Sequence, residues 1–164
     1  MKKFVVSDLH GCSDIYVSLI SYLDNLSIVE KEDVHLYING DLIDRGPGSF
    51  KMLLDVIEGC SYSDNVTVHY IAGNHEQLMF NSCLNRLQNG NFGFDSWDLN
   101  GSLATKNGLS EMSKKDFLNL VRYISNLPVY EKFPEKVGRS NILLAHAAAP
   151  KVVEDKCHLK LKSD

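Results

Sequence analysis

Four apolar stretches of this 164-residue chain each end in side chains that can bind a metal ion. The endings are Ser7-Asp8-Leu9-His10, Asn39-Gly40-Asp41, Gly73-Asn74-His75 and Ala145-His146. Carboxylate, imidazole and amide groups without a thiolate favour first-row ions such as Mn, Fe, Zn, Co or Ni over a cysteine-bound zinc. A single aspartate after a strand is usually a turn or capping residue, and a lone histidine is usually an interior one. The repetition at four places therefore indicates a metal centre.

Short strands must carry these endings to one place. Residues 4–6, 36–38 and 66–72 are the strand candidates of the first part of the chain, rich in β-branched and aromatic residues. Ligands of open α/β sheets bind at the carboxyl ends of the strands. Asp8 and His10 are predicted to point to one side of an extended backbone, because alternate residues share a face. Gly40 and Gly73 precede ligand candidates, where we expect tight turns.

Helices are expected between the strands. The sequence predicts a helix capped by Ser13 or Asp14, a second capped by Ser49, and a third after residue 75. A fourth begins at Ser113 and ends at Leu127-Pro128. Apolar residues recur at helical spacing in each. These are Ile15, Leu19, Leu23 and Leu26; Phe50, Leu53, Leu54 and Ile57; Met79, Cys83 and Leu87; Phe117, Leu120, Val121 and Ile124.

The remaining segments complete an α/β or α+β pattern. Residues 129–133 and 141–145 are predicted to be antiparallel strands joined by a turn that contains proline and glycine. Residues 88–108 carry many Asn and Gly and little periodicity. Because Phe92, Phe94 and Trp97 lie there, we expect a packed surface excursion and not a flexible linker.

A centre with two metal ions fits the hydrolysis of phosphate esters, because two ions can hold the attacking oxygen and neutralise the phosphoryl charge. Three stretches carry a family resemblance: Asp8-Leu9-His10-Gly11, Gly40-Asp41-Leu42-Ile43-Asp44-Arg45-Gly46 and Gly73-Asn74-His75-Glu76. They resemble the signature motifs of the calcineurin-like metallophosphoesterases, in the form found in the phosphoprotein phosphatase branch. Residues 97–101 are similar to a segment of bacterial and phage-type members, which include dinucleoside tetraphosphatases.

The resemblance implies a role for each matching residue. Asp8 and His10 would bind the first metal ion, Asp41 would bridge both, and Asn74 and His146 would bind the second. His75 would be the general acid that protonates the leaving oxygen, oriented by Asp44, and Arg45 would hold phosphate oxygens through its planar fork. A hydroxide activated by the metals would attack phosphorus directly. Two simpler interpretations stay open: Arg45 could pair with a surface acid, and Glu76 could merely favour the first turn of a helix.

The sequence departs from the family pattern after His146. The family has a further metal-binding histidine, a second phosphate-binding arginine and more strands, whereas here only His158 follows, without the family's preceding glycine, and Arg139 comes earlier. We expect a single domain over residues 1–164, a β-sandwich flanked by helices that lacks terminal strands of the second sheet. The second metal would bind weakly, and an exposed sheet edge would favour self-association or completion of the site by another chain.

Composition excludes other classes of protein. A net charge of −4 and a pI near 5.8 argue against a nucleic-acid-binding surface. No apolar run approaches the roughly 20 residues of a membrane span, and the short run after Met1 stops at Asp8, so we expect no export signal. The four cysteines include no C-x-x-C pair, so we expect reduced thiols in or near the core and a cytoplasmic location.

Three functions remain open at this stage. The first is a metal-dependent serine/threonine-type protein phosphatase, acting on a phosphorylated protein with two divalent ions, most simply Mn. The second is a hydrolase of bis(5'-nucleosyl) tetraphosphates, with a nucleotide as substrate. The third is a shortened, weakly active or inactive form that binds a metal.

Overall fold

The computed structural model describes residues 1–59 and 64–147, so the predictions on Cys60, Cys157 and His158 lie outside the described residues. The elements, in chain order, are β1 (Lys2–Val6), α1 (Ser13–Glu30), β2 (Val34–Asn39), α2 (Ser49–Glu58), β3 (Val66–Ile71), α3 (Asn74–Asn89), the short 3-10 helix η1 (Asp98–Asn100), α4 (Leu103–Glu111), α5 (Lys114–Ser125), β4 (Tyr130–Val137) and β5 (Ser140–Ala145). The mixed α/β class is therefore confirmed.

A parallel sheet in the order β1-β2-β3 brings the first three ligand-bearing segments together. Val6 lies opposite Ile38, and Ile38 lies opposite Tyr70, so the three strands end nearly level. The loop after each strand starts at the same edge of the sheet, which is the edge where α/β proteins bind ligands. The sequence pattern alone predicted this arrangement.

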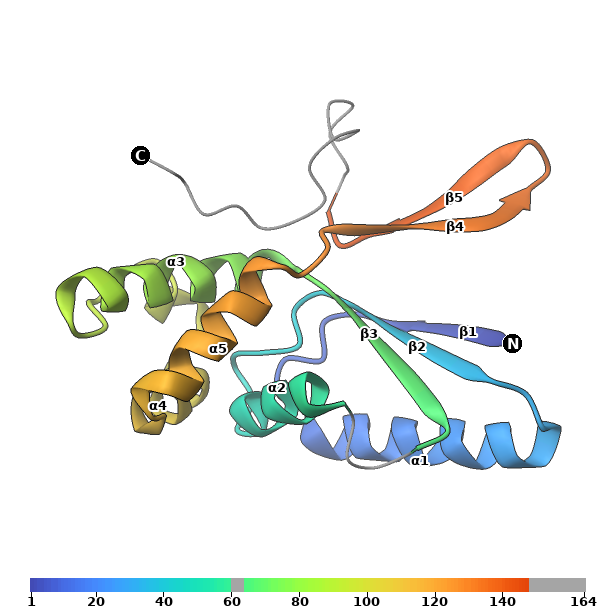
Figure 1. The fold of residues 1–164 in the computed structure, drawn as a ribbon, viewed down its shortest axis with the longest axis horizontal. Helices are drawn as coiled ribbons and strands as arrows, with labels where there is room; N and C mark the ends of the chain where they lie inside the picture. The colour runs from blue at the N-terminus through green and yellow to red at the C-terminus, as the bar shows by residue number, and fades with distance from the viewer. Residues whose placement is uncertain (60–63, 148–164) are drawn as a thin grey trace.

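The main core lies between this sheet and the helices below it in Figure 1. Tyr16, Ile20 and Leu23 of α1 are fully buried, whereas Ile15 is 59% exposed. The predicted helix is correct, and three of its four predicted inner residues do meet the core: Leu23 is buried, and Leu19 and Leu26 pack against the core. The prediction is wrong for Ile15, and it missed Tyr16 and Ile20. Two capping predictions are also wrong: Cys12 precedes α1 and Gly48 precedes α2, neither with a side-chain cap.

The hairpin of β4 and β5 covers the sheet face opposite α1 (Figure 1). The two strands are antiparallel, as predicted. Phe133 packs edge-on against Tyr37 of β2, with ring centroids 4.9 Å apart, and Lys3 of β1 pairs with Glu135. The sheets thus face one another as a sandwich, which confirms the predicted fold class. The second sheet has two strands within the described part of the chain.

Residues 88–108 contain more structure than predicted. They include η1 and the start of α4, a helix that the sequence pattern missed because Asn107 and Gly108 obscure its periodicity. Trp97 is fully buried and Phe92 packs against the core, as expected, but Phe94 is 81% exposed. Glycine is required at position 108 of α4, because a Cβ there would lie 2.1 Å from the Phe50 ring.

The start of α5 and one cysteine agree with the sequence analysis. Ser113 caps α5 by accepting a hydrogen bond from the backbone N–H of Asp116. Cys83 is buried, and burial raises the pKa of its thiol to about 12, whereas Cys12 is exposed and contradicts the prediction for that thiol. Among the described residues no helix is both long and apolar enough to cross a membrane.

Candidate metal centre

Two groups of potential metal ligands share Asp41 at the edge where the parallel strands end. One group is His10, Asp41 and His75, and the other is Asp8, Asp41 and His146. Within each group the donor atoms lie within 4.8 Å of one another. Asp41 Oδ2 is 3.8 Å from His10 Nε2 and 3.4 Å from His146 Nε2, so one buried carboxylate faces two imidazoles.

Backbone carbonyls fix the rings of both imidazoles. Nδ1 of His10 lies 3.0 Å from the carbonyl of Ile43, and Nδ1 of His146 lies 2.8 Å from the carbonyl of Asn39. A carbonyl only accepts, so each Nδ1 donates and the Nε2 of a neutral ring presents a lone pair toward Asp41. This arrangement is characteristic of metal-binding histidines, whose other ring nitrogen donates to a carbonyl or carboxylate.

Asn74, the first residue of α3, adds an amide oxygen to this cluster. Its Oδ1 lies 3.1 Å from Nε2 of His146. When Nδ1 of His146 carries the ring proton, both atoms are acceptors and no hydrogen bond joins them. A cation between Asn74, His146 and Asp41 would satisfy all three, so the donor set fits a divalent ion that accepts oxygen and imidazole ligands.

The backbone at this edge is unusual. Among residues 1–59 and 64–147, six non-glycine residues have a positive φ, and five of them are predicted site residues: Asp8, His10, Asp41, Asp44 and Arg45. The expectation that extended backbone aligns Asp8 with His10 is therefore wrong, although His10 Nε2 does lie 3.9 Å from Asp8 Oδ1. Left-handed backbone is costly for such residues and clusters at functional sites.

The two glycines beside the ligands have different roles. Gly40 has φ +76°, and a Cβ there would lie 2.5 Å from Nδ1 of His146, so both the turn and the close approach require glycine. Gly73 is extended, which contradicts the predicted tight turn. A Cβ at Gly73 would lie 2.2 Å from Oδ1 of Asp41, so the short distance to the carboxylate requires glycine there.

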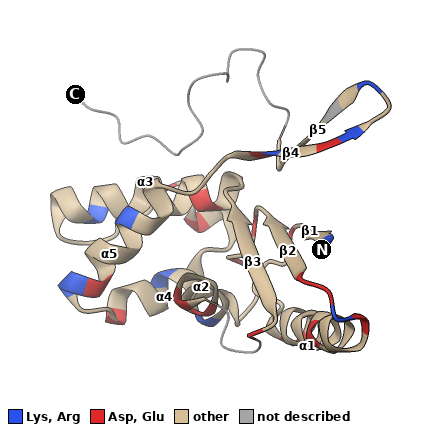
Figure 2. Ribbon diagram, turned by 45° about the vertical axis from the view of Figure 1, so that its right-hand side comes forward, with Lys and Arg blue, Asp and Glu red and all other residues tan. Residues whose placement is uncertain are grey.

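Figure 2 shows acidic residues, in red, at the start of α3. Glu76 lies in the first turn of this helix and ties the loop after β2 to the loop after β3. Its buried carboxyl group accepts backbone N–H groups from Asp41, Leu42 and Gly73 at 2.7–3.1 Å. Burial raises the pKa of Glu76, and these hydrogen bonds oppose that rise. The sequence interpretation of Glu76 as a residue that merely favours a helical turn missed this function.

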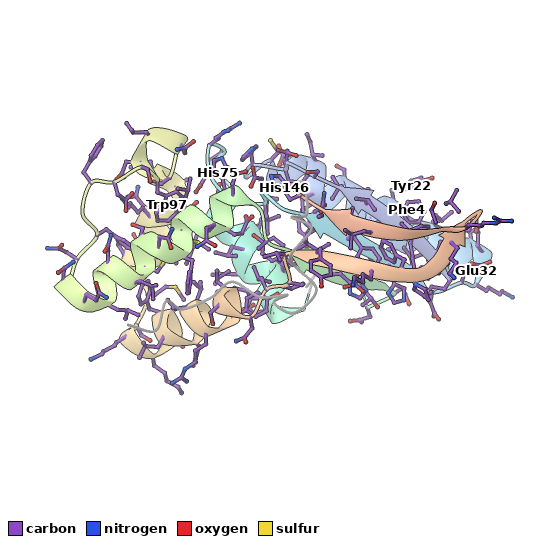
Figure 3. The ribbon with its side chains drawn as sticks, turned by 90° about the horizontal axis from the view of Figure 1, so that it is seen from above. Phe4, Tyr22, Glu32, His75, Trp97 and His146 are labelled. Carbon is purple, nitrogen blue, oxygen red and sulfur yellow. The ribbon has the colours of Figure 1, made fainter. Side chains whose placement is uncertain are left out.

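His75, Asp44 and Arg45 form a second cluster beside the first. Nδ1 of His75 donates to Oδ2 of Asp44 at 2.8 Å, and both side chains are buried. Nε2 of His75 lies 3.9 Å from Oδ2 of Asp41 and 3.4 Å from Nη2 of Arg45. The His75 ring thus points from a buried carboxylate toward the metal-ligand group, where Oδ2 of Asp41 lies near both His75 and His146. Figure 3 labels both histidines.

Comparison with known proteins decides the family. The family model of the calcineurin-like phosphoesterases matches residues 1–162. The chain belongs to this family. The predicted family resemblance is confirmed, together with its relation to dinucleoside tetraphosphatases.

Among its relatives, the asymmetrical bis(5'-nucleosyl)-tetraphosphatase PrpE of Geobacillus thermodenitrificans is 29% identical over 87% of this chain and 56% of its own length. The symmetrical bis(5'-nucleosyl)-tetraphosphatase of Buchnera aphidicola is 36% identical over 46% of this chain and 24% of its own length. The chain thus spans about half the length of the first of these relatives and about a quarter of the length of the second. The solved structure of a mutant cold-active protein tyrosine phosphatase is 19% identical to this chain. The match covers 64% of this chain and 34% of the phosphatase chain, with a TM-score of 0.36.

All eight predicted site residues lie at this edge of the calcineurin-like fold. The metal-ligand candidates are Asp8, His10, Asp41, Asn74 and His146, and the catalytic candidates are His75, Asp44 and Arg45. The sequence analysis missed Thr105, whose hydroxyl donates to Asp44, and gave Trp97 no role beyond packing. The sequence offered no direct signal for Thr105, which follows the segment 97–101 that resembles bacterial members but lies outside it.

Proposed function

We propose that this chain hydrolyses a phosphoric ester or anhydride with the help of two divalent metal ions. The observation that carries the proposal is the position of Asp41, whose buried Oδ2 lies 3.8 Å from Nε2 of His10 and 3.4 Å from Nε2 of His146. A shared carboxylate between two donor groups is what a pair of neighbouring ions needs. When bound, such ions neutralise charge on the phosphoryl group and lower the pKa of the attacking water.

The two ion sites would differ in strength. Following the family resemblance, Asp8, His10 and Asp41 would hold the first ion, and Asp41, Asn74 and His146 the second. In this assignment His75, which the geometry groups with His10 and Asp41, is kept for proton transfer. The first set contains two carboxylates, whereas the second contains one carboxylate and a neutral amide. Because the attraction of a cation grows with ligand charge, the second site binds more weakly. We propose Mn as the ion, because carboxylate and amide oxygens suit it, with Fe, Zn, Co and Ni as alternatives that also accept imidazole.

Arg45 is positioned to bind the phosphate group. Its side chain lies at the rim of the centre, and its Nη2 is within 3.4 Å of His75 Nε2. A guanidinium holds two oxygens of a phosphoryl group with fixed geometry, which a lysine would not do. Since Arg45 and His75 meet at one point, a phosphate held by Arg45 lies beside Nε2 of His75.

His75 would then deliver a proton to the leaving oxygen. Its Nδ1 donates to Asp44, so Nε2 is the nitrogen that faces the substrate side. In the proposed step water attacks phosphorus and gives up a proton to solvent, the bond to the leaving oxygen breaks, and the proton on Nε2 passes to that oxygen. The ring then takes up a proton from solvent. Asp44 keeps the ring oriented and stabilises its protonated form.

A dinucleoside tetraphosphate is the substrate that we propose first. The similar proteins named above are bis(5'-nucleosyl)-tetraphosphatases of both the asymmetrical and the symmetrical type. A phosphorylated protein is the second candidate, supported by the exposure of the site: Asp8 has a 57% exposed side chain and Arg45 is exposed, so a bulky substrate can approach.

One set of assays separates these substrates. The full chain, loaded with Mn, is incubated with diadenosine tetraphosphate or with a phosphoserine peptide, and the products are separated by chromatography. Faster turnover of the dinucleotide, to ADP alone or to ATP with AMP, supports the first proposal. Faster release of phosphate from the peptide supports the second. Turnover of neither substrate above that of the His75→Ala variant refutes both.

A further inference from the structure

Asp44 is held by more donors than its bond to His75 requires. Oδ2 accepts from His75 Nδ1 at 2.8 Å and from the indole Nε1 of Trp97 at 2.6 Å, while Oδ1 accepts from the hydroxyl of Thr105 at 2.7 Å. Asp44 is 0% exposed, and so are Trp97 and Thr105. Both extra donors come from the segment 92–106, and none of the proposed metal ligands lies in this segment.

This segment is itself fixed around Trp97. Lys106 Nζ contacts both carboxylate oxygens of Asp98 at 2.7 Å and lies 5.4 Å from the centre of the Trp97 ring. Phe92 meets the same ring edge-on, with centroids 6.2 Å apart. Contacts on several sides thus fix the indole plane, and with it the direction of the N–H bond toward Asp44.

The same segment also contacts the neighbour of Asp44. The carbonyl of Gly101 accepts the backbone N–H of Arg45 at 2.8 Å. A Cβ on Gly101 would lie 3.1 Å from Cγ of Arg45, so the backbone at Gly101 runs very close to Arg45. Asp44 and Arg45 both have left-handed backbone, with φ of 71° and 65°. The segment therefore holds two consecutive residues in a conformation that they would not favour alone.

We propose that Trp97 and Thr105 are positioning residues for the Asp44–His75 pair. The inference rests on the proposed function, in which His75 protonates the leaving oxygen. A carboxylate with one partner can turn about its terminal bond, whereas three donors fix its plane. The indole N–H only donates, so it holds Oδ2 as an acceptor beside His75. The ring of His75 is thereby kept with Nε2 toward Arg45, and proton delivery depends steeply on such alignment.

The kinetic test compares two leaving groups in the Mn-loaded full chain. Thr105→Val removes the hydroxyl, Thr105→Ser keeps it, and Trp97→Phe keeps an aromatic ring without the N–H. Phenyl phosphate has a basic leaving group that needs a proton, and p-nitrophenyl phosphate needs one much less. Loss of a hydrogen bond to a charged group predicts a kcat on phenyl phosphate about 10- to 100-fold lower in Thr105→Val and Trp97→Phe. We expect a smaller loss on p-nitrophenyl phosphate, an unchanged KM, and restoration by Thr105→Ser.

Three outcomes would overturn the inference: equal losses on both substrates, no loss, or a Thr105→Ser variant as impaired as Thr105→Val. The His75→Ala variant, assayed beside them, tests the proposed function separately. If that variant turns over phenyl phosphate at the wild-type rate, His75 is not the proton donor and the proposed function fails in that part. If it loses activity while Trp97→Phe and Thr105→Val do not, only the present inference fails.

A second readout needs neither metal nor turnover. Trp97 is the single tryptophan of the chain, so a proton–nitrogen NMR spectrum contains one indole N–H signal. We expect this signal to lie downfield, to exchange slowly with water and to move in the Asp44→Asn variant. Exchange at the rate of a free indole, or no shift in Asp44→Asn, would contradict the hydrogen bond on which the inference depends.

Discussion

At the scale of single residues, the candidate centre combines strained backbone with converging charge. Asp41 is 3% exposed, has left-handed backbone and belongs to both groups of potential metal ligands. Oδ1 also accepts the backbone N–H of His75 at 3.1 Å, which leaves Oδ2 for the imidazoles of His10 and His146. One side chain therefore links the two proposed ion sites to the proposed proton donor.

Metal binding should separate the roles of Asp41 and Asn74. Calorimetric titration of the metal-free chain with Mn is expected to show two ions per chain with unequal affinity. Asp41→Asn, which keeps the shape and removes the charge, weakens both sites, because the carboxylate faces both ligand groups. Asn74→Ala weakens only the second.

Asn81→Ala is the matched control for these substitutions. It removes an exposed amide of α3 whose only bond in the described structure is to Gln77. Two ions of unchanged affinity in Asp41→Asn would refute the shared position of this residue.

At the scale of secondary-structure elements, the sequence predicted best where local chemistry and tertiary packing agree. The helix α5 was predicted with its cap and all four buried residues, because Ser113 and the apolar spacing favour the same structure. Along α1 apolar residues occur on several faces, so periodicity identified Leu19, Leu23 and Leu26 but wrongly added Ile15 to the inner face. Contacts with the sheet bury Tyr16 and Ile20 and leave Ile15 exposed.

The helix α4 was missed because Gly108, which lowers its helix propensity, is needed for close packing against another helix. Gly108 lies against the ring of Phe50 of α2, where no Cβ fits. In an isolated helix alanine is preferred over glycine by about 1 kcal/mol, which makes Gly108 look like a break in the sequence. This close packing of α4 on α2 is a tertiary fact that no local pattern reveals.

Gly108→Ala is therefore expected to destabilise the protein despite the better helix propensity of alanine. Overpacking against Phe50 should lower the free energy of unfolding by about 1–3 kcal/mol, measured by urea denaturation. Gly93→Ala is the matched control, because a Cβ at Gly93 meets nothing within 4 Å and its φ is ordinary. A Gly108→Ala variant as stable as the wild type, or more stable, would show that the two helices are not packed this closely.

At the scale of the whole molecule, the two sheets complete the site together. The hairpin brings His146 to the end of β2, where Asn39 makes two hydrogen bonds to this part of the chain. The carbonyl of Asn39 accepts from Nδ1 of His146, and the side-chain amide of Asn39 donates to the carbonyl of Ala145. The polar endings of the strands and the family resemblance predicted the residues of the candidate centre, and the α/β pattern predicted their common edge. The supports from Trp97, Thr105 and Glu76 were not predictable, because they join segments 34 to 61 positions apart.

The strand β1 lies at the edge of the parallel sheet and pairs only with β2 in the described part of the chain. Val5 on this strand is 53% exposed. An edge strand offers unpaired backbone groups to a second chain, so self-association stays a prediction. Sedimentation velocity should show a sedimentation coefficient that rises with protein concentration, and less so in Val5→Lys. A coefficient independent of concentration in the wild type would contradict it.

The central claim is that this chain is a hydrolase whose metal ions share Asp41. The most direct measurement is the turnover of p-nitrophenyl phosphate by chelator-treated protein, with and without added Mn, beside the Asp41→Asn variant. We predict turnover only with Mn, and a loss of at least about 100-fold in Asp41→Asn, the size expected when a buried charged partner is removed. Equal turnover without metal, or an Asp41→Asn variant as active as the wild type, would contradict the account.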